Sequence, residues 1–408
     1  MEVVVVPDAV LVAGGGGVGG GHPPEESNFL ERFIGQLKAF GFVVIEVPRS
    51  EHLARLEAVA ALFFAQEEEI KARSKMSLEL GEGQVSPNES KPMGYLSLYD
   101  YEFFDMRAMN EKTANFPLWV AAEGVKVPLE EDSTTRSLTF RECLENSFAI
   151  LSRLAGTLLS ALDEDLAPLR EDGRSWVTLS SLLQPSTAVT SPPYVSSSVL
   201  RLMHYHPLSP SLLPLASSAP PVAPTTDTKA TTTTPQSSDP PETYQDDGSI
   251  DEDGDDGTEE IREELLVFEE HTDIGLLTIA PLSSTPALQI RRRDSGGWVQ
   301  VESLFASGGT SPKTPAAPIE PKRSRFLVFG GDALQQASHG VFVAAQHRVV
   351  MPSHRATDRF SFPFFQRPEA EAVINAEASP SSPSLATSLH KPCRFVPIKA
   401  WMDDKDYS

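Results

Sequence analysis

The chain has 408 residues, 34 of them proline, and a formal net charge of -23 at pH 7. Twelve acidic residues and one arginine between Glu242 and Glu264 give a net -11 of that charge, so the rest of the chain is only moderately acidic. No basic stripe with interleaved aromatic residues is present, which argues against a nucleic-acid partner and against binding to an anionic membrane surface.

The N-terminal segment, residues 1–26, is predicted to be a flexible linker. Its glycine tract contains the pattern G-x-G-x-x-G, but Gly21 runs into His22-Pro23-Pro24 instead of opening a helix, so a dinucleotide site is rejected. The segment lacks the basic start and continuous apolar run of a signal peptide, and no stretch approaches the roughly 20 apolar residues of a membrane span. The chain has two cysteines, Cys143 and Cys393. They form no disulfide framework, and we expect a cytoplasmic protein.

Residues 27–198 are predicted to form a mainly helical half. Apolar residues from Phe29 to Phe40 recur at helical spacing after Ser27, a residue type that favours helix caps. Gly41 ends that helix, and 42–45 reads as a strand. Two further amphipathic helices are predicted over 53–73 and 141–168.

Residues 199–370 are predicted to form a core of short strands. The expected strands are 199–205, 265–268, 271–279, 287–291, 298–301, 326–329, 342–350 and 359–365. Two inserts, 209–260 and 303–324, are too rich in small and polar residues to bury a core, and both are predicted to be disordered. Many short strands separated by turn residues indicate a double-sheet jelly roll of the cupin type, and 371–408 is left as a tail.

The acidic run from Asp251 to Asp256 lies in the first insert and does not form a calcium loop. Counted from Asp251, Asp256 stands where the turn glycine of an EF-hand belongs, and Arg262 stands where its bidentate glutamate belongs. We interpret the run as a solvated acidic tract.

The pattern with the most chemical meaning is His271-Thr272-Asp273, followed by His347. Residues i and i+2 of a strand face the same side, so His271 and Asp273 can present an imidazole and a carboxylate to one point. His347, on another predicted strand, completes a set of two histidines and one carboxylate. Such a set binds non-haem Fe(II) on one side and leaves the other positions open. The sequence therefore predicts an oxygenase.

Arg359-Phe360-Ser361 places two more polar groups at i and i+2. A guanidinium matches a carboxylate through two parallel hydrogen bonds, and a serine hydroxyl adds one donor. This pair is therefore predicted to anchor a dicarboxylate co-substrate. His204 and His206 also stand at i and i+2, but if Tyr205 faces the core then both point away from it. No carboxylate is expected to accompany them, and no metal role is assigned to them.

On these motifs the chain resembles the Fe(II)- and 2-oxoglutarate-dependent oxygenases of the isopenicillin-N-synthase-like family. The resemblance covers most of 27–208 and 261–370, and it extends to Gly296-Gly297-Trp298-Val299 and Phe329-Gly330-Gly331-Asp332. It implies that His271, Asp273 and His347 hold the iron and that Arg359 and Ser361 hold the distal carboxylate of 2-oxoglutarate. No catalytic residue beyond the metal site is assigned.

The stretch from Leu200 to Tyr205 is similar to a strand of that family in which an Asn-x-Tyr contributes to co-substrate binding. Tyr205 is present here and is assigned to co-substrate binding, whereas Met203 stands in the place of the asparagine and is assigned no role. The resemblance implies cofactors Fe(II), 2-oxoglutarate and O2, and oxidation of a C–H bond of a small molecule with release of succinate and CO2. We expect a monomer.

Two alternatives remain open. The first is an iron-dependent oxidase that does not use 2-oxoglutarate, in which Arg359 and Ser361 would have no co-substrate to bind. The second is a non-catalytic jelly-roll protein that docks partners through the acidic Pro/Thr-rich insert. Tyr95, Tyr99, Tyr101 and Phe103 lie where relatives often line the substrate pocket, but packing roles fit them equally, and the substrate itself is not predicted.

Overall fold

The computed structural model describes residues 2–8, 24–48, 50–74, 93–98, 101–108, 123–128, 137–170, 177–183, 196–207, 264–306, 323–352, 357–369, 372–375 and 395–397. Nearly all of the two predicted inserts, including the acidic run at Asp251–Asp256, lies outside these residues, as does the glycine tract. Of the described helices, none is long and apolar enough to cross a membrane.

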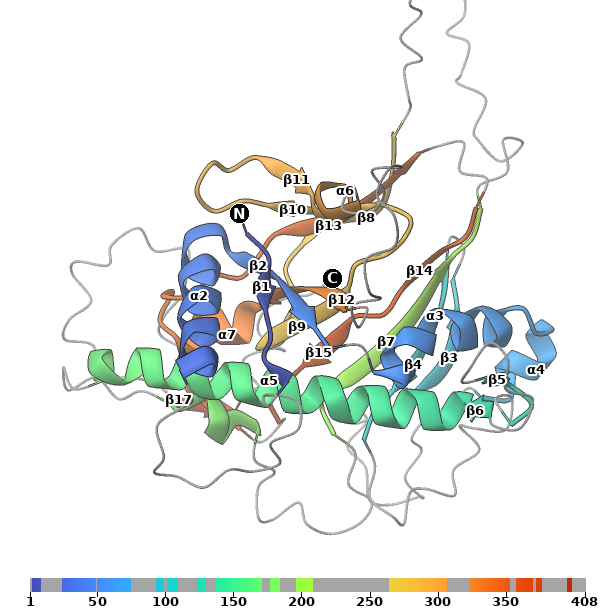
Figure 1. Ribbon diagram of the computed structural model, residues 1–408, viewed down its shortest axis with the longest axis horizontal. Helices are drawn as coiled ribbons and strands as arrows, with labels where there is room; N and C mark the ends of the chain where they lie inside the picture. The colour runs from blue at the N-terminus through green and yellow to red at the C-terminus, as the bar shows by residue number, and fades with distance from the viewer. Residues whose placement is uncertain are drawn as a thin grey trace, which may run out of the picture.

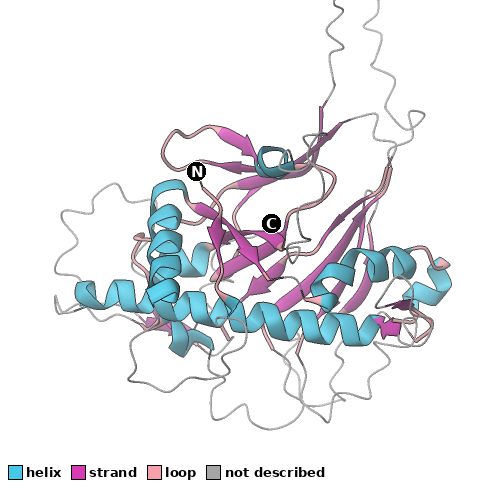
Figure 2. Ribbon diagram, in the orientation of Figure 1, coloured by secondary structure: helices cyan, strands magenta, loops and turns pink. Residues whose placement is uncertain are grey.

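Most described strands belong to two facing sheets. The larger sheet has nine strands, in the order β1-β2-β12-β9-β15-β7-β4-β3, with β14 also paired to β7. The smaller sheet has four, in the order β11-β10-β13-β8. Their bounds are β1 Val4–Val5, β2 Phe42–Val47, β3 Gly94–Ser97, β4 Tyr101–Met106, β7 Val199–Tyr205, β8 Glu264–His271, β9 Leu277–Pro281, β10 Leu288–Arg291, β11 Trp298–Gln300, β12 Ser324–Gly330, β13 His347–Pro352, β14 Arg359–Ser361 and β15 Phe364–Gln366. The two-sheet arrangement agrees with the predicted jelly roll (Figure 2).

The longer helices cover the outer face of the larger sheet, and the smaller sheet lies on the opposite side, next to the short helix α6 (Val301–Ala306; Figure 1). The helices are α2 Pro24–Phe40, α3 Glu51–Phe64, α4 Glu68–Ala72, α5 Phe140–Arg170, the 3-10 helix η3 Leu179–Leu183, α6 Val301–Ala306 and α7 Asp332–Ala337. The long α5 runs across the sheet, and its leucine stripe from Leu144 to Leu166 is buried in the main apolar cluster. At the start of α3 the Ser50 hydroxyl oxygen accepts a hydrogen bond from the Leu53 N–H at 3.0 Å, a regular helix cap.

Two apolar clusters lie between the two sheets, and one of them contains Tyr205. The buried members of that cluster are Phe103, Met203, Tyr205, Ala287, Val349 and Met351, and Tyr101 and Phe268 pack against them. Because Tyr205 faces this cluster, the neighbouring His204 faces the helices, where its ring stacks on Phe360 at 4.8 Å between centroids. The inside of the jelly roll is therefore largely apolar at the level of Tyr205.

Several predicted boundaries were wrong. The strand expected over 271–279 breaks at Thr272–Leu276, and the one over 342–350 begins only at His347. The strand over 359–365 is interrupted at Pro363, which has no N–H to donate to the sheet. Val301 opens α6 instead of ending a strand, and that helix includes residues 303–306 of the predicted second insert.

The N-terminal half also differs from the prediction. The helix expected over 53–73 is divided into α3 and α4. Val4 and Val5, expected in the flexible segment, pair in parallel with β2. The predicted helical half contains strands, among them β3 and β4, which extend the larger sheet, and the small antiparallel pair β5 Lys126–Pro128 and β6 Ser137–Thr139. In the tail, β16 Val373–Asn375 pairs with β17 Phe395–Pro397.

Candidate metal centre

His271, Asp273 and His347 come together at one end of the smaller sheet. Each offers one ligand atom, and these atoms lie within 4.8 Å of one another. His271 ends β8 and His347 begins β13, and the two residues are paired in register across these strands. Asp273 lies just beyond the end of this strand. The grouping of the three residues was predicted correctly, but Asp273 lies in a loop and not in the continuous strand that was expected.

Both imidazoles have an orientation that suits a metal ligand. The Nδ1 atom of His271 lies 2.8 Å from the Glu269 carbonyl oxygen, and the Nδ1 atom of His347 lies 3.1 Å from that of Ala345. Each Nδ1–H can therefore donate to a carbonyl, which leaves Nε2 as the available lone pair. Burial, followed by the neighbouring His347, lowers the pKa of His271 and favours its neutral form.

The Asp273 carboxylate is held from its far side. The Thr278 hydroxyl donates a hydrogen bond to Asp273 Oδ2, while Oδ1 lies 3.8 Å from His347 Nε2. Phe268 and Phe329 pack against His271 and His347, each at 4.8 Å between ring centroids. The donor set of two imidazole nitrogens and one carboxylate oxygen, oriented by outer partners and flanked by aromatic rings, fits Fe(II). Thr278 was missed in the sequence because a threonine in a strand carries no signal of its own.

The turn that carries Asp273 is fixed by the start of α7. The Asp332 N–H donates to the Asp273 carbonyl oxygen at 2.7 Å, and the Ala333 N–H donates to those of Ile274 and Gly275 at 3.2 Å. Gly331 permits this approach, because a Cβ at that position would lie 2.5 Å from the Asp273 carbonyl oxygen and closer still to that of Gly275. The Gly-Gly-Asp motif therefore positions the loop that carries Asp273.

We expect Gly331→Ala to displace the Asp273 loop and to weaken Fe(II) binding about tenfold or more, in line with the loss of an outer-shell support. The measurement is Fe(II) affinity of the anaerobic protein, together with thermal unfolding. Gly35→Ala is the matched control, because a Cβ there has nothing within 4 Å and alanine favours a helix interior. Unchanged iron affinity in Gly331→Ala would show that the loop has another support.

Arg359 lies deep between the sheets, 2% exposed. Its Nε–H donates to the Thr285 carbonyl oxygen at 3.1 Å, and its Nη2–H donates to Glu302 Oε1 at 2.8 Å. The guanidinium carbon lies 5.2 Å from the centre of the Tyr205 ring. Arg359 and Tyr205 were both predicted to bind the co-substrate, and the structure places them together, paired in register across β14 and β7.

Ser361 is half-buried on β14, two residues from Arg359 and opposite Met203. Residues i and i+2 of a strand share a face, so its hydroxyl lies on the same side as the guanidinium. The Tyr205 hydroxyl donates to the Met203 sulfur at 3.5 Å, a weak acceptor in the place of the expected asparagine. Glu302 was not predicted, since nothing in the sequence marks it as a partner of an arginine 57 residues away.

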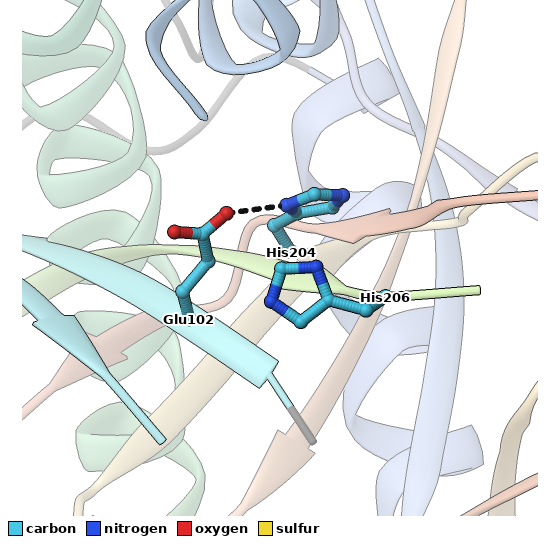
Figure 3. Close-up of side chains that lie close together, drawn as sticks. All are labelled: Glu102, His204 and His206. Atoms are coloured by element: carbon cyan, nitrogen blue, oxygen red, sulfur yellow. Dashed lines mark hydrogen bonds and ion pairs between the residues drawn. The ribbon is translucent and has the colours of Figure 1, made fainter. Parts of the chain in front are cut away.

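A second cluster, Glu102, His204 and His206, also brings three possible ligand atoms within 4.8 Å (Figure 3). The prediction that His204 points away from Tyr205 was correct, but the expectation that no carboxylate accompanies it was wrong. His204 Nδ1 lies 2.7 Å from Glu102 Oε1, and Nε2 lies 3.0 Å from Asp358 Oδ1. The other Glu102 oxygen accepts from the Lys71 ammonium and from the Tyr95 hydroxyl. These partners satisfy Glu102 and His204 without a metal.

This network ties α4, β4, β7 and the start of β14 together and predicts an acid-sensitive stability. Burial opposes ionisation of Glu102, but hydrogen bonds from His204, Lys71 and Tyr95 outweigh it and lower its pKa from 4.5 to about 2. Because the folded pKa is depressed, the stabilisation is full above pH 4.5 and is lost as the pH falls toward 2. Glu102→Gln should cost about 3 kcal/mol at pH 7, since Lys71 loses a buried partner. Urea unfolding at pH 7 and pH 3 measures the difference in the free energy of unfolding between wild type and Glu102→Gln. This difference should be smaller at pH 3, and an equal difference at both pH values would contradict this assignment.

Residues 251–368 match the family model described as the 2OG-Fe(II) oxygenase superfamily. Feruloyl CoA ortho-hydroxylase 1 of Arabidopsis thaliana is 30% identical over 104 residues, which are 26% of this chain and 23% of that protein. Gibberellin 2-beta-dioxygenase 3 of the same plant is 33% identical over 114 residues, 28% of each chain. The alignments therefore span about a quarter of the length of these curated relatives.

The fold has solved counterparts. The crystal structure of a full-length Neurospora crassa protein, in complex with alpha-KG and 5-formyluracil, superposes with a TM-score of 0.55 at 16% identity, over 98% of this chain and 94% of that one. At this identity the likeness concerns the fold alone, and it confirms the predicted jelly roll. The family match confirms the predicted resemblance to 2-oxoglutarate oxygenases, whose cofactors are Fe(II), 2-oxoglutarate and O2.

Proposed function

We propose that this chain, whose residues 251–368 carry a 2OG-Fe(II) oxygenase domain, is an Fe(II)- and 2-oxoglutarate-dependent dioxygenase that oxidises a C–H bond of a small organic molecule. The observation that carries the proposal is the convergence of His271, Asp273 and His347 within 4.8 Å inside the matched region. When bound, Fe(II) would supply the oxidising chemistry together with 2-oxoglutarate and dioxygen, with succinate and CO2 as co-products.

The residues of the chain bind, orient and exclude water. His271 and His347 offer Nε2 because their Nδ1–H groups donate to backbone carbonyls, and Asp273 offers Oδ1 because Thr278 engages Oδ2. Arg359 has one nitrogen, Nη1, that is buried and has no partner among the described residues, and it is the donor left for a distal carboxylate. The Ser361 hydroxyl and the Tyr205 ring lie on the same side as this guanidinium and would complete the co-substrate pocket.

The apolar cluster between the sheets keeps this region dry. Met203, Val349 and Met351 are each less than a tenth exposed, and Tyr101 and Phe103 extend the same lining. Exclusion of water strengthens the hydrogen bonds to a bound carboxylate and prevents side reactions. Tyr95, in contrast, is committed to the Glu102 network and does not line this space.

The test is formation of succinate from 2-oxoglutarate in the presence of Fe(II), O2 and a panel of small molecules. The panel should include feruloyl CoA, gibberellins and pyrimidines, because the similar proteins are named for such compounds or were solved with one bound. We expect one class to raise succinate formation above the basal rate and to gain an oxygen atom or lose two hydrogens. If the iron-loaded protein forms no succinate, either with any compound of the panel or without an added compound, the proposal fails.

One observation favours a second candidate, an iron-dependent oxidase that does not use 2-oxoglutarate. Arg359 already has an internal carboxylate partner in Glu302, so its charge is balanced without a co-substrate. Oxygen consumption with substrate but without any 2-oxo acid would distinguish this enzyme from the dioxygenase.

We also propose that the protein is a cytoplasmic monomer without a nucleic-acid partner. The support is a buried free thiol at Cys143, the lack of a basic stripe, and an acidic net charge of -23. Light scattering after gel filtration tests the oligomeric state, and a fluorescent fusion in cells tests the localisation; a stable dimer or a secreted fusion would contradict them.

The division into an N-terminal segment 1–26, a half 27–198, a core 199–370 and a tail 371–408 stays a proposal, and limited proteolysis with cuts concentrated at 209–260 and 303–324 would support it.

A further inference from the structure

Glu302 places a carboxylate inside the region assigned to the co-substrate. It lies in the first turn of α6 and is 3% exposed. Its Oε2 accepts from the N–H groups of Ala287 and Leu288 at 2.6 and 3.0 Å, and Oε1 accepts from the Ser283 N–H at 3.2 Å. Three backbone donors therefore hold this carboxylate in place, in addition to Arg359.

The Arg359–Glu302 ion pair is fully buried, since each side chain is 2% exposed. Two of the three guanidinium nitrogens have acceptors, Nε on Thr285 and Nη2 on Glu302, while Nη1 is buried without a partner among the described residues. A buried donor left without an acceptor is unfavourable, and a bound carboxylate would satisfy Nη1. A carboxylate bound there shares one guanidinium with the carboxylate of Glu302.

We infer that Glu302 is a built-in counter-charge that neutralises Arg359 and lowers the affinity of the pocket for the distal carboxylate of 2-oxoglutarate; this inference rests on the proposed function. Two anions on neighbouring nitrogens of one guanidinium repel each other strongly in a buried site. Glu302 has no room to withdraw, because its three backbone donors would be left without an acceptor. The pocket therefore distinguishes a 2-oxo diacid from a 2-oxo monoacid less sharply than a lone arginine would.

Replacement of Glu302 also removes a partner that orients Arg359, which by itself would weaken 2-oxoglutarate binding. We expect this loss to be smaller than the gain in affinity from removal of the counter-charge. The Nε bond to Thr285 remains, and the Tyr205 ring and the surrounding side chains confine the guanidinium. In Glu302→Gln the amide oxygen can still accept from Ala287 and Leu288, whereas the amide nitrogen cannot accept from Arg359. The Nη2 edge is then released to the co-substrate, which can bind bidentately.

The experiment is an anaerobic titration of the Fe(II)-loaded protein with 2-oxoglutarate, followed by the visible absorption of the chelate. We expect Glu302→Gln to lower the Kd for 2-oxoglutarate about tenfold, which corresponds to about 1.4 kcal/mol. The matched ligand control is 2-oxopentanoate, which lacks the distal carboxylate and should bind both proteins within about twofold. When Glu302→Gln is combined with Arg359→Lys, the gain in 2-oxoglutarate affinity should be smaller, because lysine lacks the planar guanidinium that binds the carboxylate.

An unchanged or higher Kd for 2-oxoglutarate in folded Glu302→Gln would overturn the inference. If circular dichroism shows that this variant does not fold, the wild-type protein supplies the test by itself. A preference for 2-oxoglutarate over 2-oxopentanoate below about a hundredfold supports the counter-charge, and a larger preference overturns it. A wild-type protein that binds iron but neither acid contradicts the proposed function itself, an outcome distinct from any result with Glu302→Gln.

Discussion

Asp273→Ala is expected to remove Fe(II) from the protein and to abolish succinate formation. Asp273 is the only carboxylate among the three grouped side chains, and its loss leaves two neutral imidazoles, which would hold a divalent iron ion weakly. Loss of an outer-shell partner alone costs about 10- to 100-fold in metal affinity, so loss of this ligand should cost more than about a hundredfold. The measurement is iron content after anaerobic gel filtration, together with succinate yield.

The control for that variant is Asp294→Ala. Asp294 is an exposed aspartate that pairs with Arg292 in the turn after β10, and its removal should change neither iron content nor activity. Thr278→Val is the intermediate case, because it frees the Asp273 oxygen that the hydroxyl engages while it preserves the shape of the side chain. Stoichiometric iron in Asp273→Ala would show that the iron site lies elsewhere.

Arg359→Lys is expected to raise the Kd for 2-oxoglutarate about a hundredfold while iron content stays unchanged. Lysine keeps a positive charge opposite Glu302 but loses the planar fork that meets a carboxylate through parallel hydrogen bonds. Complete removal of the charge, as in Arg359→Ala, would leave Glu302 unpaired and should cost about 3–5 kcal/mol of stability, so lysine is the better probe.

The binding defect is measured by the same chelate titration, and the KM for 2-oxoglutarate should rise much more than kcat falls. Arg325→Lys is the matched control, since Arg325 forms a partly exposed ion pair with Glu46 on the larger sheet. Equal affinity for 2-oxoglutarate in wild type and Arg359→Lys would favour the oxidase that works without this co-substrate.

The sequence was most informative where a local pattern alone determines the structure. The alternating strand over 199–205 has the predicted bounds, and parity placed Tyr205 and His204 on opposite faces as expected. The grouping of His271 with His347 also followed from strand reasoning, since the two are direct neighbours across β8 and β13. These features depend on a period of two residues and little else.

Other features depend on contacts between distant segments. The apolar run from Leu276 to Ile279 reads as a continuation of the preceding strand, and only the contact of Asp332 with the Asp273 carbonyl oxygen shows that the chain turns there. The Glu102 carboxylate reaches His204 from β4, in a half that was expected to be helical. Glu302 contacts Arg359 although the predicted insert 303–324 separates the two residues in the sequence. Tertiary pairing of this kind leaves no periodicity in a single sequence.

The measurement that tests the account most directly is an anaerobic titration of the purified protein with Fe(II) and 2-oxoglutarate, recorded as the visible charge-transfer band of the chelate. It needs no knowledge of the substrate. The account predicts a saturable band in the wild type, its loss in Asp273→Ala, and a shift to much higher 2-oxoglutarate concentration in Arg359→Lys. Bound iron without any band in the wild type would contradict the assignment of 2-oxoglutarate as co-substrate, and failure to bind iron would contradict the metal centre itself.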